Sequence, residues 1–246
     1  MGSALRSLVF ALFQGIVTPL HALASLALFW LPRIPRFRFI HWWCYEMLWG
    51  ARLICGIRHR VVGLENAPPR PCVVMSKHSS TWETLALNTL FFPNSYVAKK
   101  ELLSLPFFGW AFALASPITI DRKAGHDSMQ QMARQGRARV AEGFSIIVYP
   151  EGTRIPAGKR GRYKTGGVRL AKELGIPILP VAHNAGYLWP KGTFGKKPGT
   201  ITISIGEPID PAGRDVQALS NEVENWIENE VSRLGVPDSG GVTKAP

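Results

Sequence analysis

The chain has 246 residues, which is enough for one domain with a buried core and an appended segment. It carries 29 lysine and arginine residues against 17 acids, a formal net charge of +12, which favours an anionic partner such as nucleic acid, a membrane surface or a phosphorylated substrate. The three cysteines, Cys44, Cys55 and Cys72, lie among apolar residues and form no C-x-x-C pair, which argues against a disulfide framework and a zinc site.

The first predicted element is an apolar helix near the N-terminus. Residues 8–31 contain no lysine, arginine, aspartate or glutamate, and this length is enough to cross a hydrocarbon core of about 30 Å. A cleaved signal peptide is the alternative, because Ala22-Leu23-Ala24 resembles a cleavage site. The apolar run continues through that site to Trp30, so we expect a helix that is retained and associates with a membrane.

A second apolar stretch covers residues 39–57 and contains aromatic residues suited to the membrane-water interface, namely Trp42, Trp43, Tyr45 and Trp49. Glu46 and Arg52 weaken this stretch as a complete span. We therefore expect residues 1–58 to form a two-helix membrane motif, either one span with an interfacial helix or a hairpin within one leaflet. The alternative is that both helices cover the core of the following domain.

From residue 59 to residue 235, short apolar runs alternate with longer amphipathic ones, the pattern of an α/β domain. Strands are predicted at residues 60–64, 72–76, 95–98, 117–121, 145–149, 177–182 and 200–205. Helices are predicted at residues 81–90, 127–142, 165–174 and 215–234. We expect a mixed, largely parallel sheet of about seven strands flanked by helices, followed by a flexible tail at residues 236–246.

The stretch from Val73 to Leu85 carries the first candidate site. His78 lies just beyond a predicted strand, where open α/β sheets bind their ligands, and a histidine at such a position is well placed for catalysis. Ser80 and Glu83 have the spacing of a capping box at the start of the next helix. Glu83 either reaches back to orient His78 or only caps the helix, and the residues alone leave both interpretations open.

This stretch also carries a family resemblance. His78 followed by an acid five residues later resembles the H-x-x-x-x-D block of the glycerolipid acyltransferases, the family that contains the 1-acylglycerol-3-phosphate acyltransferases. The resemblance implies that His78 is the general base for the acceptor hydroxyl and that Glu83 orients it and stabilises the imidazolium. Glu83 departs from the family aspartate by one methylene, so the geometry of the acid and the histidine must differ slightly.

A second block, at residues 99–122, resembles the acceptor-binding block of the family. The substrate-binding candidates in it are Lys99, Gly109 and Arg122. A guanidinium at the edge of the sheet can hold a phosphate through two hydrogen bonds. The alternative for Arg122 is a surface ion pair with Asp121.

A third block, at residues 148–154, is similar to the family's F-P-E-G-T-R with Tyr149 in place of phenylalanine. It adds four substrate-binding candidates: Glu151, Gly152, Thr153 and Arg154. The resemblance implies that Arg122 and Arg154 grip the acceptor phosphate and that Glu151 helps to shape the pocket. A fourth block, residues 176–181, resembles the family's apolar block around a proline.

Residues 154–172 contain seven lysine and arginine residues and no acid. This segment is either a solvated basic face or a rim that attracts anionic lipid or the phosphates of an acyl donor. The histidines His59, His126 and His183 have no partners at metal-binding spacing, so we interpret them as structural or surface residues.

The resemblance implies an enzyme that transfers an acyl group from acyl-CoA or acyl-carrier protein to the sn-2 hydroxyl of 1-acylglycerol 3-phosphate. It implies no metal, no bound cofactor and no nucleic-acid partner. Acyl thioesters are cytosolic, so we expect a protein of the inner (cytoplasmic) membrane whose catalytic domain faces the cytosol. Two alternatives are an acyltransferase for another lyso-lipid, such as a lyso-ornithine lipid or a lysophospholipid, and a basic membrane-bound protein that binds anions without chemistry.

Overall fold

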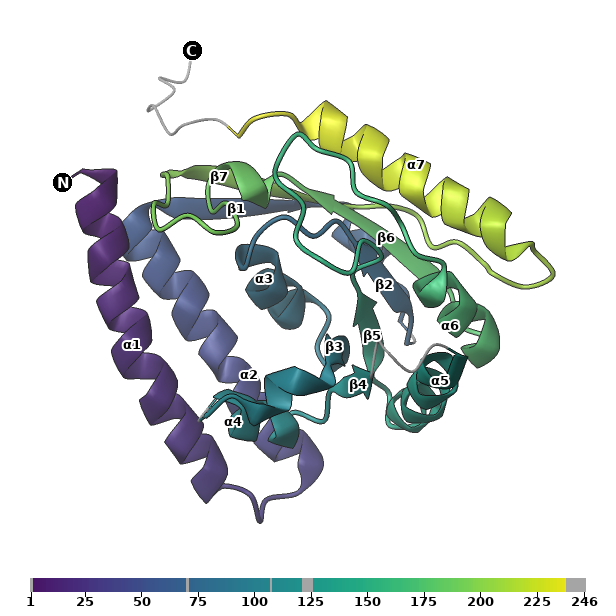
Figure 1. The fold of residues 1–246 in the computed structure, drawn as a ribbon, viewed down its shortest axis with the longest axis horizontal. Coiled ribbons are helices and arrows are strands. Elements are labelled where there is room, and N and C mark those ends of the chain that lie inside the picture. The colour runs from purple at the N-terminus through teal and green to yellow at the C-terminus, as the bar shows by residue number, and fades with distance from the viewer. Residues whose placement is uncertain (1, 70, 107, 121–125, 238–246) are drawn as a thin grey trace.

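The computed structural model of the chain describes residues 2–69, 71–106, 108–120 and 126–237 (Figure 1). Two long helices come first, α1 (Ser3–Ala27) and α2 (Arg33–Gly50), and a short π-helix at Ala51–Cys55 leads into the domain. The remaining α-helices are α3 (Trp82–Leu90), α4 (Phe108–Leu114), α5 (His126–Ala141), α6 (Gly166–Leu174) and α7 (Val216–Leu234).

Seven strands form one sheet in the order β1-β7-β6-β2-β5-β3-β4. They are β1 (Ile57–Val62), β2 (Val73–Ser76), β3 (Asn94–Lys99), β4 (Ile118–Ile120), β5 (Ser145–Val148), β6 (Ile178–His183) and β7 (Gly199–Ile205). The strands from β6 to β4 are parallel, whereas β7 pairs with β6 in the antiparallel sense and with β1 in the parallel sense. The prediction of a mixed, largely parallel sheet is confirmed.

Helices cover both faces of this sheet (Figure 1). Val73 and Met75 of β2 pack in the cluster that contains residues of α5, α6 and α7, whereas Val74 packs with residues of α1, α2 and α3. Because both faces are buried, β2 is an unbroken apolar run rather than an alternating one. This explains why its sequence predicts a buried strand.

The two N-terminal helices lie side by side against the domain, and α1 also packs on α4. The inner side of α1 is buried at Phe10, which joins Cys44 and Met47 of α2 in the core. Its outer side exposes the large apolar side chains of Leu5, Leu8, Leu12, Ile16, Leu20 and Leu23. Within the described residues, α1 is the one helix long and apolar enough to cross a membrane. The helices therefore contribute to the core and also present an apolar surface.

Between β3 and β4, the structure contains two helical segments that the sequence did not predict. A 3-10 helix at Lys100–Ser104 is followed by α4. A Cβ atom added at Gly109 of α4 would lie 2.5 Å from the carbonyl oxygen of Leu103, so glycine permits this close packing of backbone on backbone. These segments were missed because their apolar residues follow no sustained period in so short a stretch.

Candidate active site

The parallel strands β2, β5 and β6 end at the same edge of the sheet, and the residues there hold His78 in place. The amide of Lys77 donates to the carbonyl of Val181, and the Nε2 of His183 donates to the carbonyl of Lys77 at 2.8 Å. The His78 amide donates to Glu151 Oε2 at 2.9 Å, and the His78 carbonyl accepts from the amide of Ile155 at 2.7 Å. The peptide groups on both sides of His78 are therefore fixed.

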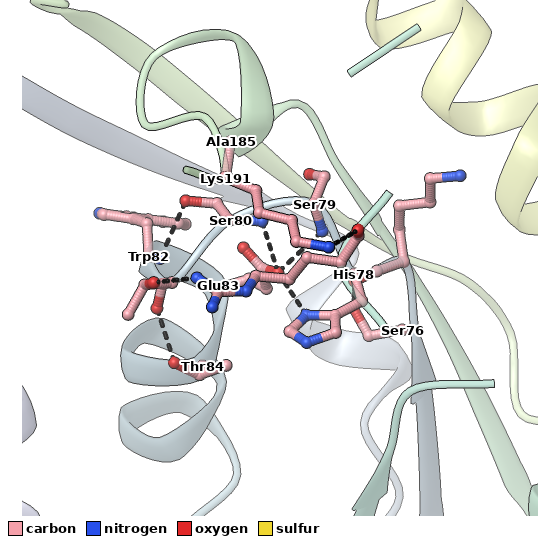
Figure 2. A network of polar contacts seen from close by, with 12 residues as sticks. Ser76, His78, Ser79, Ser80, Trp82, Glu83, Thr84, Ala185 and Lys191 are labelled. Atoms are coloured by element: carbon pink, nitrogen blue, oxygen red, sulfur yellow. Dashed lines mark hydrogen bonds and ion pairs between the residues drawn. The ribbon is translucent and has the colours of Figure 1, made fainter. Parts of the chain in front are cut away.

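The His78 ring faces the carboxylate of Glu83 (Figure 2). The Nδ1 atom of His78 lies 2.8 Å from Glu83 Oε1, and the same oxygen accepts from the amides of Ser79 and Ser80 at 2.9 Å. One carboxylate oxygen therefore contacts the histidine and also caps the start of α3. Ser80 completes the turn differently from a standard capping box, because its hydroxyl accepts from the Trp82 amide at 3.0 Å.

Glu83 is fully buried, yet it stays ionised at neutral pH. Burial raises the pKa of its carboxyl, but the nearby His183 ring, the hydrogen bond from His78 and the Ser80 amide together hold that pKa below its ordinary value. Because an ionised carboxylate only accepts hydrogen bonds, His78 Nδ1 must carry a proton. The Nε2 atom of the neutral ring is then free to act as a base.

Tyr149 supports the His78 ring from one face. The two rings are stacked with centroids 4.0 Å apart and an interplanar angle of 17°, and Tyr96 stacks behind Tyr149 at 6.0 Å. This packing restricts rotation of the imidazole. It also places a π-face beside the imidazolium that forms when Nε2 accepts a proton.

A cavity of about 380 Å³ opens beside His78 and runs between α1, α2, α3, β3 and α4. Its apolar lining includes Ala22, Phe37, Trp43, Leu85, Phe112 and Pro117. Arg154 lines the same cavity, and its guanidinium donates to Thr81 Oγ1 at 2.7 Å. The cavity therefore presents a base and a cation together with a largely apolar wall.

The last four residues of the third block form a turn after β5, and their side chains have different surroundings. Both oxygens of Glu151 bind within the protein, Oε1 to the Lys77 ammonium at 2.8 Å and Oε2 to the His78 amide. Gly152 has a φ angle of 66°, a conformation that glycine adopts without strain. Thr153 is exposed, and Lys191 donates to its hydroxyl at 3.4 Å and to the Arg154 carbonyl at 3.1 Å.

The structure describes two of the three candidates of the second block, Lys99 and Gly109. Lys99 is exposed at the end of β3, and Gly109 is buried in the packing of α4. Neither of them lines the cavity beside His78. Arg122 lies outside the described residues.

Three further residues at this edge were not identified from the sequence as parts of a site. Lys77 is buried with its ammonium paired to carboxylates, and His183 is buried behind Glu83, with its Nε2 atom 4.0 Å from Glu83 Oε2. Lys191 reaches the third block from a loop without a recognisable motif. Of these three residues, only His183 had a signal in the sequence, because it lies at the end of a predicted strand, where ligands bind in open α/β sheets.

Comparisons with known proteins identify similar sequences with stated activities. The family model described as Acyltransferase matches residues 58–184. The chain is 44% identical to a 1-acyl-sn-glycerol-3-phosphate acyltransferase of Pseudomonas aeruginosa, over 85% of this chain and 84% of the relative. It is 31% identical to the 1-acyl-sn-glycerol-3-phosphate acyltransferase alpha of Mus musculus, over 79% of this chain and 71% of the relative.

The fold also matches that of a solved structure. The crystal structure of the 1-acyl-sn-glycerophosphate acyltransferase PlsC from Thermotoga maritima matches 94% of this chain and 95% of its own chain, with a TM-score of 0.77 and 25% sequence identity. The histidine-acid pair beside an apolar cavity occurs here in a fold and a sequence shared with acyl-transferring enzymes. The chain therefore belongs to the acyltransferase family.

Proposed function

We propose that this enzyme transfers an acyl group from acyl-CoA or acyl-carrier protein to the sn-2 hydroxyl of 1-acylglycerol 3-phosphate. The observation that carries the proposal is the His78–Glu83 pair at the mouth of an apolar cavity that Arg154 also lines. Such a site offers a base for a hydroxyl, a cation for a phosphate and an apolar space for an acyl chain. The named activities of the relatives support the same substrate.

In this reaction, the Nε2 atom of His78 removes the proton from the sn-2 hydroxyl. The oxygen attacks the thioester carbonyl, the tetrahedral intermediate collapses, and the carbon-sulfur bond breaks. The imidazolium then returns the proton to the departing thiolate, so the histidine is regenerated. Glu83 stabilises the imidazolium through its ionised carboxylate, and the face of Tyr149 adds a cation–π contribution.

Arg154 is our proposed ligand of the acceptor phosphate, since its guanidinium lies beside the cavity that His78 lines. Thr153 belongs to the same turn and its hydroxyl offers a further donor, whereas the Gly152 amide already donates to the Tyr149 carbonyl at 2.9 Å. Arg122 and Lys99 join this set on the family resemblance alone. For Glu151 we propose an indirect role, because both of its oxygens are engaged by Lys77 and the His78 amide.

The cavity walls suit an acyl chain. Each methylene moved from water into an apolar environment contributes about 0.8 kcal/mol, so a chain in this cavity supplies binding energy that increases with its length. The cavity lies partly between α1 and α2, whose outer surfaces carry exposed apolar residues. A chain therefore enters from the side of the molecule that we propose faces the bilayer.

We propose that residues 1–58 lie in the cytosolic leaflet of the inner membrane instead of crossing it. The Ser3 hydroxyl donates to the Lys196 carbonyl at 2.5 Å, and the Ser7 hydroxyl accepts from the Lys196 amide at 2.9 Å. Elsewhere along its length, α1 packs on α4. A helix attached to the domain in this way could not cross the bilayer without moving the domain, whereas its exposed apolar side suits an interfacial position.

The direct test is a transfer assay with purified protein, labelled acyl-CoA or acyl-carrier protein, and 1-acylglycerol 3-phosphate. We expect labelled phosphatidic acid from at least one donor, and about 10²- to 10⁴-fold slower transfer by the His78→Ala variant. Lyso-ornithine lipid and lysophosphatidylcholine serve as acceptors that lack a terminal phosphate. Faster transfer to either of them than to 1-acylglycerol 3-phosphate would contradict the proposal.

A further inference from the structure

Lys77, the residue before His78, is a buried cation with no part in the proton transfer. Its side chain is 2% exposed. Its ammonium donates to Glu151 Oε1 and to Glu228 Oε1, both at 2.8 Å, and to the carbonyl of Lys159 at 3.0 Å. An ammonium group has three N–H donors, so all three are used.

These contacts join segments that are far apart in the sequence. Glu151 belongs to the turn after β5, Lys159 to the lysine- and arginine-rich segment at residues 154–172, and Glu228 to the C-terminal helix α7. Glu228 Oε1 also accepts from the hydroxyl of Tyr163 at 2.8 Å. Lys77 therefore fixes α7 to the strand end that carries His78, and Tyr163 fixes α7 to the segment of residues 154–172.

The cluster reaches His78 through Glu151. The oxygen Oε1 of that carboxylate binds the Lys77 ammonium, while Oε2 accepts from the amide of His78. Any shift of the ammonium moves the carboxylate that holds the backbone of the base. Glu228 competes with Glu151 for this ammonium, because the one cation is shared between the two carboxylates.

We propose that Glu228 and Lys77 are positioning residues for His78, and that α7 thereby forms part of the support of the active site. This inference rests on the proposed acyl transfer for its kinetic consequence. The contacts predict a specific pattern: loss of Glu228 changes the placement of the His78 ring and the rate of turnover, and it leaves the affinity for both substrates nearly unchanged. Misplacement of a reacting group by about 1 Å can lower a rate about 100-fold.

The experiment compares Glu228→Leu, Glu228→Gln and Glu224→Gln. Glutamine keeps an oxygen for Lys77 and Tyr163 but removes the charge, whereas leucine removes both. Glu224 lies one turn earlier on α7, pairs with the exposed Arg160 at 2.8 Å, and provides the matched control. We expect kcat to fall about 100-fold with leucine and about tenfold with glutamine, with both KM values within about twofold, and no change for Glu224→Gln.

A second measurement does not depend on any substrate. In the full chain with isotope-labelled histidine, the ring signals of His78 are identified by their loss in His78→Ala. We expect these signals to shift in Glu228→Gln and to stay in place in Glu224→Gln. This measurement remains valid if 1-acylglycerol 3-phosphate is not the acceptor. Failure of the proposed function can therefore be distinguished from failure of the positioning role of Glu228. Unchanged His78 signals in Glu228→Gln, or a loss of activity that lies in KM, would overturn the inference.

Discussion

Two buried carboxylates hold His78 from different sides, Glu83 by the ring and Glu151 by the backbone amide. Burial raises the pKa of both, yet the pKa of Glu83 ends below its ordinary value and that of Glu151 ends above it. Glu83 Oε1 accepts three hydrogen bonds, and the Glu83 carboxylate lies near the imidazoles of His78 and His183, whereas Glu151 shares one ammonium with the carboxylate of Glu228. Burial prevails over the partners at Glu151, whereas the partners prevail over burial at Glu83, so the balance between burial and partners sets the pKa of each carboxyl.

The two carboxylates therefore have different tasks. On the ring side of His78, Glu83 provides a stable negative charge for an imidazolium. On the backbone side, Glu151 and its partners provide a rigid connection between distant segments. Substitutions that distinguish charge from shape should therefore act differently on the two sides. The predictions below test this division, beginning with the largest expected effect.

The His78→Ala variant removes the residue that both sides hold. We expect acyl transfer to fall about 10²- to 10⁴-fold, the usual range for loss of a general base, while folding and membrane association persist because the ring packs at the mouth of a cavity. Activity measurements, thermal unfolding and vesicle flotation check these outcomes. A variant that retains half of the wild-type turnover would remove His78 from the reaction.

The Glu83→Gln variant tests the ring side by removing charge while keeping an oxygen for His78 Nδ1 and the amides of Ser79 and Ser80. We expect kcat to fall about 10²-fold with little change in melting temperature. The matched control is Asp215→Asn, because Asp215 caps α7 by accepting from the amides of Gln217 and Ala218 and does not line the cavity beside His78. Equal activity in both variants would mean that Glu83 only caps its helix.

Arg154 follows Glu151 in the chain but reaches the ring side, so it tests whether the acceptor lies there. Lysine keeps the charge and loses the paired geometry of the guanidinium. Losing one charge-assisted hydrogen bond, worth about 1.5 to 3 kcal/mol, should raise the KM for 1-acylglycerol 3-phosphate about ten- to a hundredfold. Arg169→Lys, on the exposed side of α6, is the control. A selective rise in the donor KM would place Arg154 at the donor instead.

The smallest expected effect is the pH dependence of stability, where the two carboxylates have opposite signs. The lowered pKa of Glu83 gives stability that is present above pH 4.5 and is lost as the pH falls through the folded-state pKa. The raised pKa of Glu151 gives stability that is present below pH 4.5 and is lost as the pH rises through its folded-state pKa. Melting curves across acidic pH should therefore flatten on the acid side for Glu83→Gln and steepen for Glu151→Gln. Each 1 kcal/mol corresponds to about 2–4 °C, and parallel curves for the two variants would contradict the comparison.

The ring side of the site was accessible from the sequence, because its parts are close together in the chain. The strand before His78 is an apolar run, and Glu83 has the spacing of a cap, so local rules placed both residues at the start of a helix. The sequence could not decide between capping and orientation. The structure describes both contacts on a single oxygen of Glu83.

The backbone side was not accessible, because its partners come from opposite ends of the domain. Nothing in the local sequence of Lys77 indicates burial, and a charged residue of its kind is almost never fully buried unless it is paired. Its partner Glu228 lies on a helix whose polar residues look like an ordinary solvated face. The strand order could not be predicted for the same reason. The seven strands were predicted, but the antiparallel contact of β7 with β6 depends on pairings between distant parts of the chain.

The hydrogen bonds that join Ser3 and Ser7 to Lys196 connect α1 to a residue that is made later in synthesis, 189 residues after Ser7. At about 5–20 residues per second, roughly 10–40 seconds of translation separate α1 from this partner. Throughout that interval, the apolar sides of α1 have no folded domain to cover them. At the membrane location that we propose for residues 1–58, a bilayer surface near the ribosome can hold the helix by its outer side while the sheet is completed, so the inner side remains available for the domain that arrives later.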